Sequence, residues 1–149
     1  MKVGTDGVLL GAWVALGAAD RLLLDVGTGT GVIALMLAQR SPAAGVTALD
    51  IDAACAEQAR ANADRSPWGG RVTTCCAPVQ EYRPEEPFDL VVSNPPYFPA
   101  GSGESGGSAR MELCCTLTQV CAAAAFLLKN GGRFALVHRP ERLAGLMEA

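Results

Sequence analysis

The sequence predicts an α/β fold with a doubly wound, parallel sheet of strand order 3-2-1-4-5. Short apolar runs alternate with helix-like stretches, which is the pattern of a parallel sheet covered on both faces. A glycine-rich turn follows the first of these runs and opens a helix. The 149 residues are 50% hydrophobic and 18% charged, which suits the core of one domain, and no internal repeat divides them.

A helix is expected at the start of the chain. Thr5 is expected to cap it, because a threonine side chain can accept a hydrogen bond from the first turn. Leu9, Trp13 and Leu16 recur at helical spacing and are expected to form its packed face. Gly17 is expected to end this helix.

Five apolar runs are expected to form the strands of the sheet. They cover residues 21–26, 45–49, 71–76, 88–93 and 133–138. Three helices are expected between them, over residues 32–40, 53–64 and 112–129. Ser41-Pro42 stops the first, Asp52 caps the second and Asn130-Gly131-Gly132 closes the third. A further helix is expected to begin at Pro140, so the C-terminal strands of the sheet are expected to be truncated.

Charge and hydropathy predict a cytoplasmic protein without a membrane segment. The formal net charge is −3, so no overall basic charge indicates a nucleic-acid partner, although Arg110 and Arg139 can supply local positive charge. The longest apolar run, residues 120–128, has nine residues, whereas about 20 are needed to span a bilayer. The sequence does not open with the charged and then apolar pattern of a secretory signal.

The cysteines are expected to be reduced core residues. They are Cys55, Cys75, Cys76, Cys114, Cys115 and Cys121. No CxxC spacing is present and His138 is the only histidine, so the sequence predicts no metal site. Adjacent cysteines in a strand point to opposite faces, which makes them poor disulfide partners.

The glycine-rich turn, Gly27-Thr28-Gly29-Thr30-Gly31, predicts a ligand site. Glycines let the backbone approach a ligand with positive φ, and the following helix presents its N–H groups. Val32 stands where a dinucleotide fingerprint would have its third glycine. Asp50 ends the next strand, where a carboxylate can accept hydrogen bonds from both ribose hydroxyls. Together they indicate an adenosine-containing ligand; the alternative is a tight strand–helix turn with an incidental aspartate.

The segment Asn94-Pro95-Pro96-Tyr97 follows the fourth strand and predicts a site for an amino group. Two prolines remove two N–H donors, so the segment presents carbonyl acceptors. The Asn94 side-chain oxygen and the Pro95 carbonyl can each accept one hydrogen of an exocyclic NH₂, and Tyr97 can stack on a planar base. The alternative is a rigid Pro-Pro turn with an ordinary aromatic anchor. Strands 1 and 4 are neighbours in the predicted order, so this segment and the glycine turn should meet.

These motifs resemble a known family. Residues 25–31 with Asp50 and residues 94–97 are similar to the class I S-adenosylmethionine-dependent methyltransferases that modify amino groups. The opening at residues 2–13, with 33–40, 66–68 and 137–142, resembles the bacterial tRNA-Val adenine-N6 methyltransferases over nearly the whole chain. The resemblance implies a Rossmann-like methyltransferase sheet in a single, incomplete domain over residues 1–149. It also implies S-adenosylmethionine as cofactor and tRNA as partner.

The resemblance also implies roles for individual residues. Gly27, Gly29 and Gly31, with Thr28, would hold the methionine part of the cofactor, and Asp25 would lie near its amino group. The remaining residues with implied cofactor roles are Asp50 on the ribose, Ile51, Val79 packing on the adenine, Asn94, and Thr5 and Asp6 lining the pocket. The target adenine would lie on Asn94, Pro95, Pro96 and Tyr97, with Arg110 and Arg139 as candidate phosphate contacts. Ala77-Pro78 stands where the family usually has an acid near the cofactor adenine.

Other functions stay open at this point. The same tetrapeptide serves glutamine N5 methylation of proteins and guanine N2 methylation of rRNA. An NAD-dependent oxidoreductase is disfavoured by Val32 and leaves the Asn94 segment unexplained. A non-catalytic cofactor- or RNA-binding fragment is a further alternative. The sequence makes no prediction of oligomeric state or of the role of residues 100–108.

Overall fold

The computed structural model describes residues 3–95 and 117–138. Its elements are α1 (Thr5–Trp13), β1 (Leu22–Val26), α2 (Val32–Arg40), β2 (Gly45–Asp50), α3 (Ala53–Asp64), the 3₁₀ turn η1 (Gly69–Arg71), β3 (Val72–Cys76), β4 (Phe88–Ser93), α5 (Leu117–Leu127) and β5 (Leu128–Leu136). The expected bounds of α2, α3 and β4 are confirmed. The parts of the expected helices at residues 112–116 and from Pro140 lie outside the described residues, as do residues 100–108.

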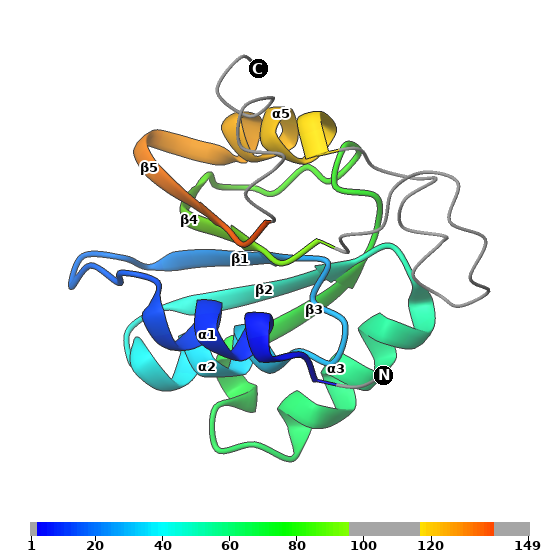
Figure 1. Ribbon diagram of the computed structural model, residues 1–149. Coiled ribbons are helices and arrows are strands. Elements are labelled where there is room, and N and C mark those ends of the chain that lie inside the picture. Colours follow the sequence, from blue (N-terminus) through cyan, green and yellow to red (C-terminus); the bar gives the residue numbers. More distant parts are fainter. Residues whose placement is uncertain (1–2, 96–116, 139–149) are drawn as a thin grey trace.

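The sheet has the predicted order, β3-β2-β1-β4-β5, and every neighbouring pair is parallel. Figure 1 shows α1, α2 and α3 on one face of this sheet and α5 on the other. The chain therefore moves outward from β1 through β2 to β3, then returns to β4 on the other side of β1. This reversal makes the carboxyl ends of β1 and β4 the point where a doubly wound sheet opens to a ligand.

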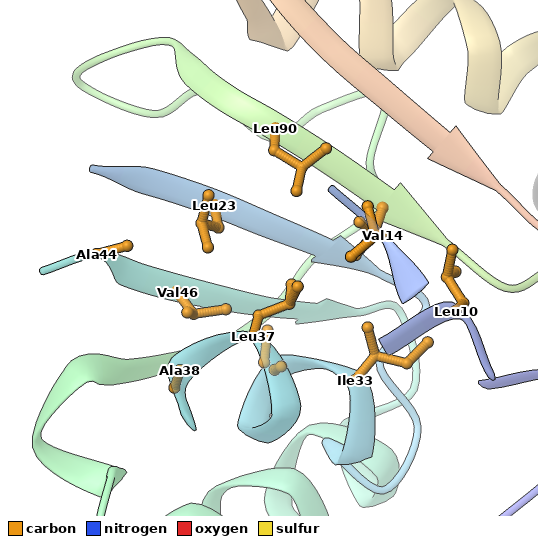
Figure 2. Packing of buried hydrophobic residues seen from close by; sticks show 12 residues of the cluster. Leu10, Val14, Leu23, Ile33, Leu37, Ala38, Ala44, Val46 and Leu90 are labelled. Atoms are coloured by element: carbon orange, nitrogen blue, oxygen red, sulfur yellow. The ribbon is translucent and has the colours of Figure 1, made fainter. Parts of the chain in front are cut away.

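Alternating side chains of the strands build a separate core on each face of the sheet. Leu23 and Leu90 point to the α1–α2 face and pack with Leu37, whereas Leu24 and Val91 point to the α5 face. Figure 2 shows the first of these clusters, with α2 side chains meeting those of the strands. Every strand residue from Phe88 to Ser93 is buried, as expected for an interior strand between β1 and β5.

Helix α1 differs from the prediction at both its cap and its face. Its N-cap is Gly4 and no side chain caps it, so the expected Thr5 cap is wrong. Leu9 is 55% exposed and Trp13 is 88% exposed, so these two residues of the expected packed face are wrong, whereas Leu16 is partly buried against the core. The helix ends at Trp13, so the expected end at Gly17 is wrong as well. The buried helical residues are Gly7, Leu10 and Gly11.

Close helix packing explains this difference. A Cβ at Gly11 would lie 2.7 Å from the Met36 Sδ of α2, and one at Gly7 would lie 3.7 Å from Ile33 Cδ1. The two glycines, four residues apart, therefore form the strip on which α1 approaches α2. Leu9 and Trp13 are left on the exposed side of α1.

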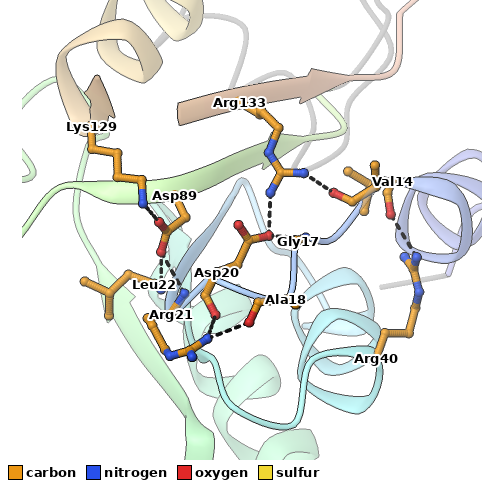
Figure 3. A network of polar contacts seen from close by, with 11 residues as sticks. Val14, Gly17, Ala18, Asp20, Arg21, Leu22, Arg40, Asp89, Lys129 and Arg133 are labelled. Carbon is orange, nitrogen blue, oxygen red and sulfur yellow. Dashed lines mark hydrogen bonds and ion pairs between the residues drawn. The ribbon is translucent and has the colours of Figure 1, made fainter. Parts of the chain in front are cut away.

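A polar network anchors the segment between α1 and β1 (Figure 3). The Arg40 guanidinium donates to the carbonyl oxygens of Gly11, at 2.7 Å, and Val14, at 2.8 Å. Arg133 of β5 donates to Ala15 O at 2.8 Å and pairs with the carboxylate of Asp20. Arginines of α2 and β5 therefore hold the end of α1 and the segment that follows it in place.

The junction of α5 and β5 is also a correction. The helix was expected to run to Lys129 and be closed by Asn130-Gly131-Gly132, but it ends at Leu127 and these residues lie inside β5. Phe88 pairs with Leu128 and Leu90 with Arg133, so the ladder is irregular between these pairs. Gly131 has φ 79°, which supplies the bend that the irregularity needs.

Two further findings concern cysteines and membranes. Cys55, Cys75, Cys76 and Cys121 are free thiols, as expected, but Cys76 is exposed and the other three are only partly buried, Cys75 against the core, so these four are not buried core residues. Cys114 and Cys115 lie outside the described residues. Among the described residues, no helix has the length and apolar character needed to cross a bilayer.

Candidate functional site

The glycine turn leaves the carboxyl end of β1 in a conformation that requires glycine. Gly27, Gly29 and Gly31 have φ values of 72°, 56° and 81°. Residues with a Cβ rarely adopt this left-handed region, so the three glycines are dictated by the backbone. The N–H groups of Gly27 and Thr28 both donate to Leu49 O of β2, at 2.8 and 3.0 Å. The turn is therefore bent back over the end of the neighbouring strand.

Helix α3 supports the turn from the side. A Cβ at Gly31 would lie 3.1 Å from the Cβ and 3.2 Å from the Cα of Ala59. The Asn62 side-chain amide donates to Thr30 O at 2.8 Å. Sequence reasoning missed both supports, because the partners lie about 30 residues away and no local pattern joins them. Gly31 thus serves helix packing as well as the turn.

Asp25 is a buried carboxylate directly beneath the turn. Its Oδ2 accepts hydrogen bonds from Thr28 Oγ1 at 2.6 Å and from the Ala34 N–H at 3.2 Å. Its Oδ1 has no hydrogen-bond partner among the described residues. Burial raises the pKa of Asp25 to about 7, against the lowering effect of the two hydrogen bonds, and the nearby Asp50 raises it further. The orphaned Oδ1 is an acceptor that suits a cationic N–H donor.

Asp50 ends β2 on the other side of the turn and is 2% exposed. Its Oδ2 accepts from the Gly29 N–H and its Oδ1 from the Asp52 N–H, each at 2.9 Å. A carboxylate oxygen has further lone pairs, so ribose hydroxyls remain possible partners. Ile51 follows, half-buried, and Asp52 caps α3 as predicted, accepting from the Ala54 N–H at 2.8 Å.

Val79, after β3, is 7% exposed and packs in the apolar cluster beneath α5. This packing accounts for its position, and its expected contact with an adenine ring stays a prediction. Thr5 and Asp6 are both exposed on the first turn of α1. Pro96, Tyr97, Arg110 and Arg139 lie outside the described residues.

Asn94 lies beside the glycine turn, as the strand order predicts. Val26 pairs with Ser93 across β1 and β4, and Ser93 Oγ donates to Val26 O at 2.9 Å. The strand ends that carry the two motifs are therefore fastened to each other, and Asn94 and Pro95 follow, both half-buried. A Cβ at Gly7 of α1 would lie 3.3 Å from Asn94 Nδ2. This contact is a site feature that the sequence analysis missed, and the paired glycines of α1 were its only signal.

The arrangement suits a ligand that combines an ammonium group with a ribose. The glycines of the turn carry no side chain that would keep a ligand from the backbone, Asp25 offers an unpaired acceptor, and Asp50 offers lone pairs for hydroxyls. Among the described residues, no group of three histidine, cysteine, aspartate or glutamate side chains is placed to hold a metal ion.

Comparison with known proteins shows the family and the fold. The family model described as methyltransferase small domain matches residues 8–144. Two structures of related fold are a methyltransferase of Thiobacillus denitrificans in complex with S-adenosylhomocysteine and a precorrin-6y C5,15-methyltransferase of Geobacter metallireducens. The first is 20% identical with a TM-score of 0.65 and covers 90% of this chain and 48% of its own. The second is 19% identical with a TM-score of 0.67 and covers 95% of this chain and 66% of its own.

Curated relatives are more similar in sequence. A protein of Bacteroides thetaiotaomicron named tRNA1(Val) (adenine(37)-N6)-methyltransferase is 47% identical over 141 residues, covering 92% of this chain and 59% of the relative. A protein of the same name in Aeromonas hydrophila is 57% identical over 102 residues, covering 68% of this chain and 42% of the relative. The chain thus spans less than two thirds of the length of these relatives.

Proposed function

This chain belongs to the methyltransferase small domain family, and we propose that the protein transfers a methyl group from S-adenosylmethionine to the N6 amino group of an adenine in tRNA. The observation that carries the proposal is the position of Asn94 directly after β4, whose last residue, Ser93, is hydrogen-bonded to the end of β1 where the glycine turn begins. Because the relatives are longer, we propose that residues 1–149 form part of a single methyltransferase domain.

The residues of the turn fit this cofactor. Gly27, Gly29 and Gly31, with Thr28, would hold its methionine part, and Asp25 Oδ1 would accept a hydrogen bond from its ammonium group. The remaining lone pairs of Asp50 would accept the ribose hydroxyls. When bound, S-adenosylmethionine supplies a methyl group on a positively charged sulfur.

The strand end at Asn94 would hold the substrate amino group. Asn94 Oδ1 and the Pro95 carbonyl would each accept one hydrogen of the exocyclic NH₂. An amine held in this way has its lone pair turned out of the ring plane, toward an electrophile. Pro96 would keep the segment rigid and Tyr97 would stack on the base, which are roles carried over from the sequence prediction.

The substrate assignment rests on the relatives. Both are named for adenine 37 of tRNA1(Val), and the match to the first covers 92% of this chain, which is enough to include both motifs. A base has to leave its stack to reach an active site. In an anticodon loop this costs little free energy, because the loop is already single-stranded. A tRNA substrate implies that the protein acts in the cytoplasm.

The test is transfer of a labelled methyl group into tRNA, rRNA and protein fractions side by side. The full-length protein is incubated with each fraction, and the labelled nucleoside or amino acid is identified by mass spectrometry. Asn94→Ala should abolish transfer and leave the Kd for S-adenosylmethionine within a few-fold. Asp50→Ala should instead weaken cofactor binding.

Label in tRNA as N6-methyladenosine supports the proposal. Label in protein as N5-methylglutamine, or in rRNA as N2-methylguanine, contradicts the substrate assignment while keeping the reaction class. Cofactor binding without transfer into any fraction contradicts the proposed activity. Normal transfer by Asn94→Ala contradicts the assignment of the substrate site.

A further inference from the structure

Gly7 is a buried residue of α1 whose own backbone does not require glycine. It lies inside the helix and lacks the positive φ that the glycines of the turn have. Alanine is the better helix former at such a position, because glycine loses more conformational freedom when it folds. The reason for a glycine here therefore lies in what a side chain would meet.

A side chain at Gly7 would meet the candidate substrate site. Among the described residues, the atom nearest to its Cβ would be Asn94 Nδ2 at 3.3 Å, followed by Cδ1 and Cγ1 of Ile33 at 3.7 and 3.8 Å. The distances to Ile33 are ordinary van der Waals contacts, whereas the distance to Asn94 is shorter than that range. Asn94 would therefore have to move by a few tenths of an ångström, while Ile33 could stay in place.

The residue before Asn94 is held on both sides, so it does not take up this movement. Ser93 is 2% exposed, and its Oγ donates to Val26 O of β1 at 2.9 Å. Its carbonyl oxygen accepts from the Val137 N–H, after β5, at 3.3 Å. The movement then falls on the side chain of Asn94, whose terminal torsion has only broad preferences of its own.

The position of this side-chain amide matters for the proposed reaction, in which Asn94 Oδ1 accepts a hydrogen of the substrate amino group. Nδ2 is the amide atom nearest to Gly7, and Oδ1 is not among the three nearest atoms, so the oxygen end lies farther from α1. A reacting group has to be held near its attack geometry, and a misplacement of about 1 Å can cost about a hundredfold in rate. A movement of a few tenths of an ångström is therefore large enough to change the kcat.

We propose that Gly7 is a positioning residue for methyl transfer: because it has no side chain, the Asn94 amide can lie where its oxygen holds the substrate amino group. This inference rests on the proposed function. Gly7 acts through Asn94 and contacts neither substrate nor cofactor itself. Gly11, about one turn further along α1, also packs closely, but the three described atoms nearest to its Cβ all belong to Met36 of α2. A comparison of the two glycines therefore separates helix packing from the effect on Asn94.

The experiment compares three glycine-to-alanine variants of α1 in the full-length protein, by methyl transfer to tRNA, cofactor titration and urea unfolding. Gly7→Ala should lower the kcat roughly tenfold and leave the KM for tRNA and the Kd for S-adenosylmethionine unchanged. Gly11→Ala brings a methyl group to 2.7 Å from Met36 Sδ, so it tests helix packing and should keep the kcat. Gly4→Ala, with no atom of the described residues within 4 Å of its Cβ, should keep it as well.

A second substitution, in α2, separates positioning from stability. Ile33→Val removes the Cδ1 that lies 3.7 Å from the Cβ position, so α1 of the Gly7→Ala variant can move toward α2 and away from Asn94. Ile33 is 4% exposed, so shortening it leaves a cavity and lowers the free energy of unfolding. The double variant should therefore unfold at a lower urea concentration than Gly7→Ala and yet recover most of the kcat. A loss of activity caused by instability would become larger in the double variant.

Each outcome decides the inference. Equal kcat for Gly7→Ala and the unmodified protein overturns the role of Gly7 and leaves the proposed function standing. A Gly7→Ala variant that does not fold, a fall in kcat that Gly11→Ala shares, or one that Ile33→Val makes larger shows a loss of packing and also overturns it. A weaker cofactor Kd for Gly7→Ala shows that α1 acts on the cofactor site and overturns it as well. Absence of transfer by the unmodified protein overturns the proposed function and this inference together.

Discussion

Asp25 should make the folded chain less stable as pH rises, and replacing it with asparagine should remove this effect. Its pKa is about 7 in the folded state and 3.8 in an ordinary environment, a difference of about 3 pH units. Each unit corresponds to about 1.4 kcal/mol, so the total effect on the free energy of unfolding is about 4 kcal/mol. The stabilisation is complete below the unfolded pKa and is lost as pH rises to the folded pKa, because the folded state keeps the proton longer.

The assay is urea unfolding of both proteins near pH 5 and near pH 8. About 2.5 kcal/mol of the loss falls in this interval, and it should be present in the unmodified chain and absent in Asp25→Asn. The asparagine oxygen can still accept from Thr28 and Ala34, so the geometry is retained. The variant should bind S-adenosylmethionine more weakly, because an amide N–H replaces the Oδ1 acceptor. An identical pH dependence in the two proteins would refute the reasoning.

Two further predictions concern stability. Gly31→Ala should lower the free energy of unfolding in urea by about 2–3 kcal/mol, because of its φ of 81° and the contact with Ala59. Gly131→Ala has a similar φ of 79° but open space around it, so it should cost about 1 kcal/mol. Equal costs would show that α3 moves aside to accept the new methyl group. Burial would raise the pKa of Asp89, but its hydrogen bond with Lys129 and those from backbone N–H groups at the start of β1 lower it to about 2. Asp89 should therefore contribute about 2.5 kcal/mol that is present above pH 4 and lost as pH falls to about 2, and Asp89→Asn should remove this acid dependence in the same unfolding assay.

The sequence predicted the elements whose ends carry local signals. Gly31 before α2 and Ser41-Pro42 after it fix the bounds of that helix, and Asp52 fixes the start of α3. The strand order followed from the doubly wound pattern, and this order predicts that Asn94 lies next to the glycine turn. The sequence could therefore predict which strand ends lie side by side, because this depends only on strand order and direction.

The sequence could not predict contacts made through the absence of a side chain. Hydropathy assigns Leu9 and Trp13 to a core, but α1 packs through Gly7 and Gly11, which carry no apolar signal. Likewise, Asn130-Gly131-Gly132 can end a helix or interrupt a strand, and only the pairing partner on β4 decides between these. Both errors arise because the deciding partner is distant in the sequence.

The glycine turn has one more consequence, which concerns the entropy of binding. Its backbone is fixed at several points by hydrogen bonds within the protein: Gly27 on Leu49, Thr30 on Asn62 and Gly29 on Asp50. The conformational entropy of shaping this loop is thus lost when the chain folds. A ligand that arrives meets a preorganised surface and does not have to order it, so the free energy of its contacts is available for affinity.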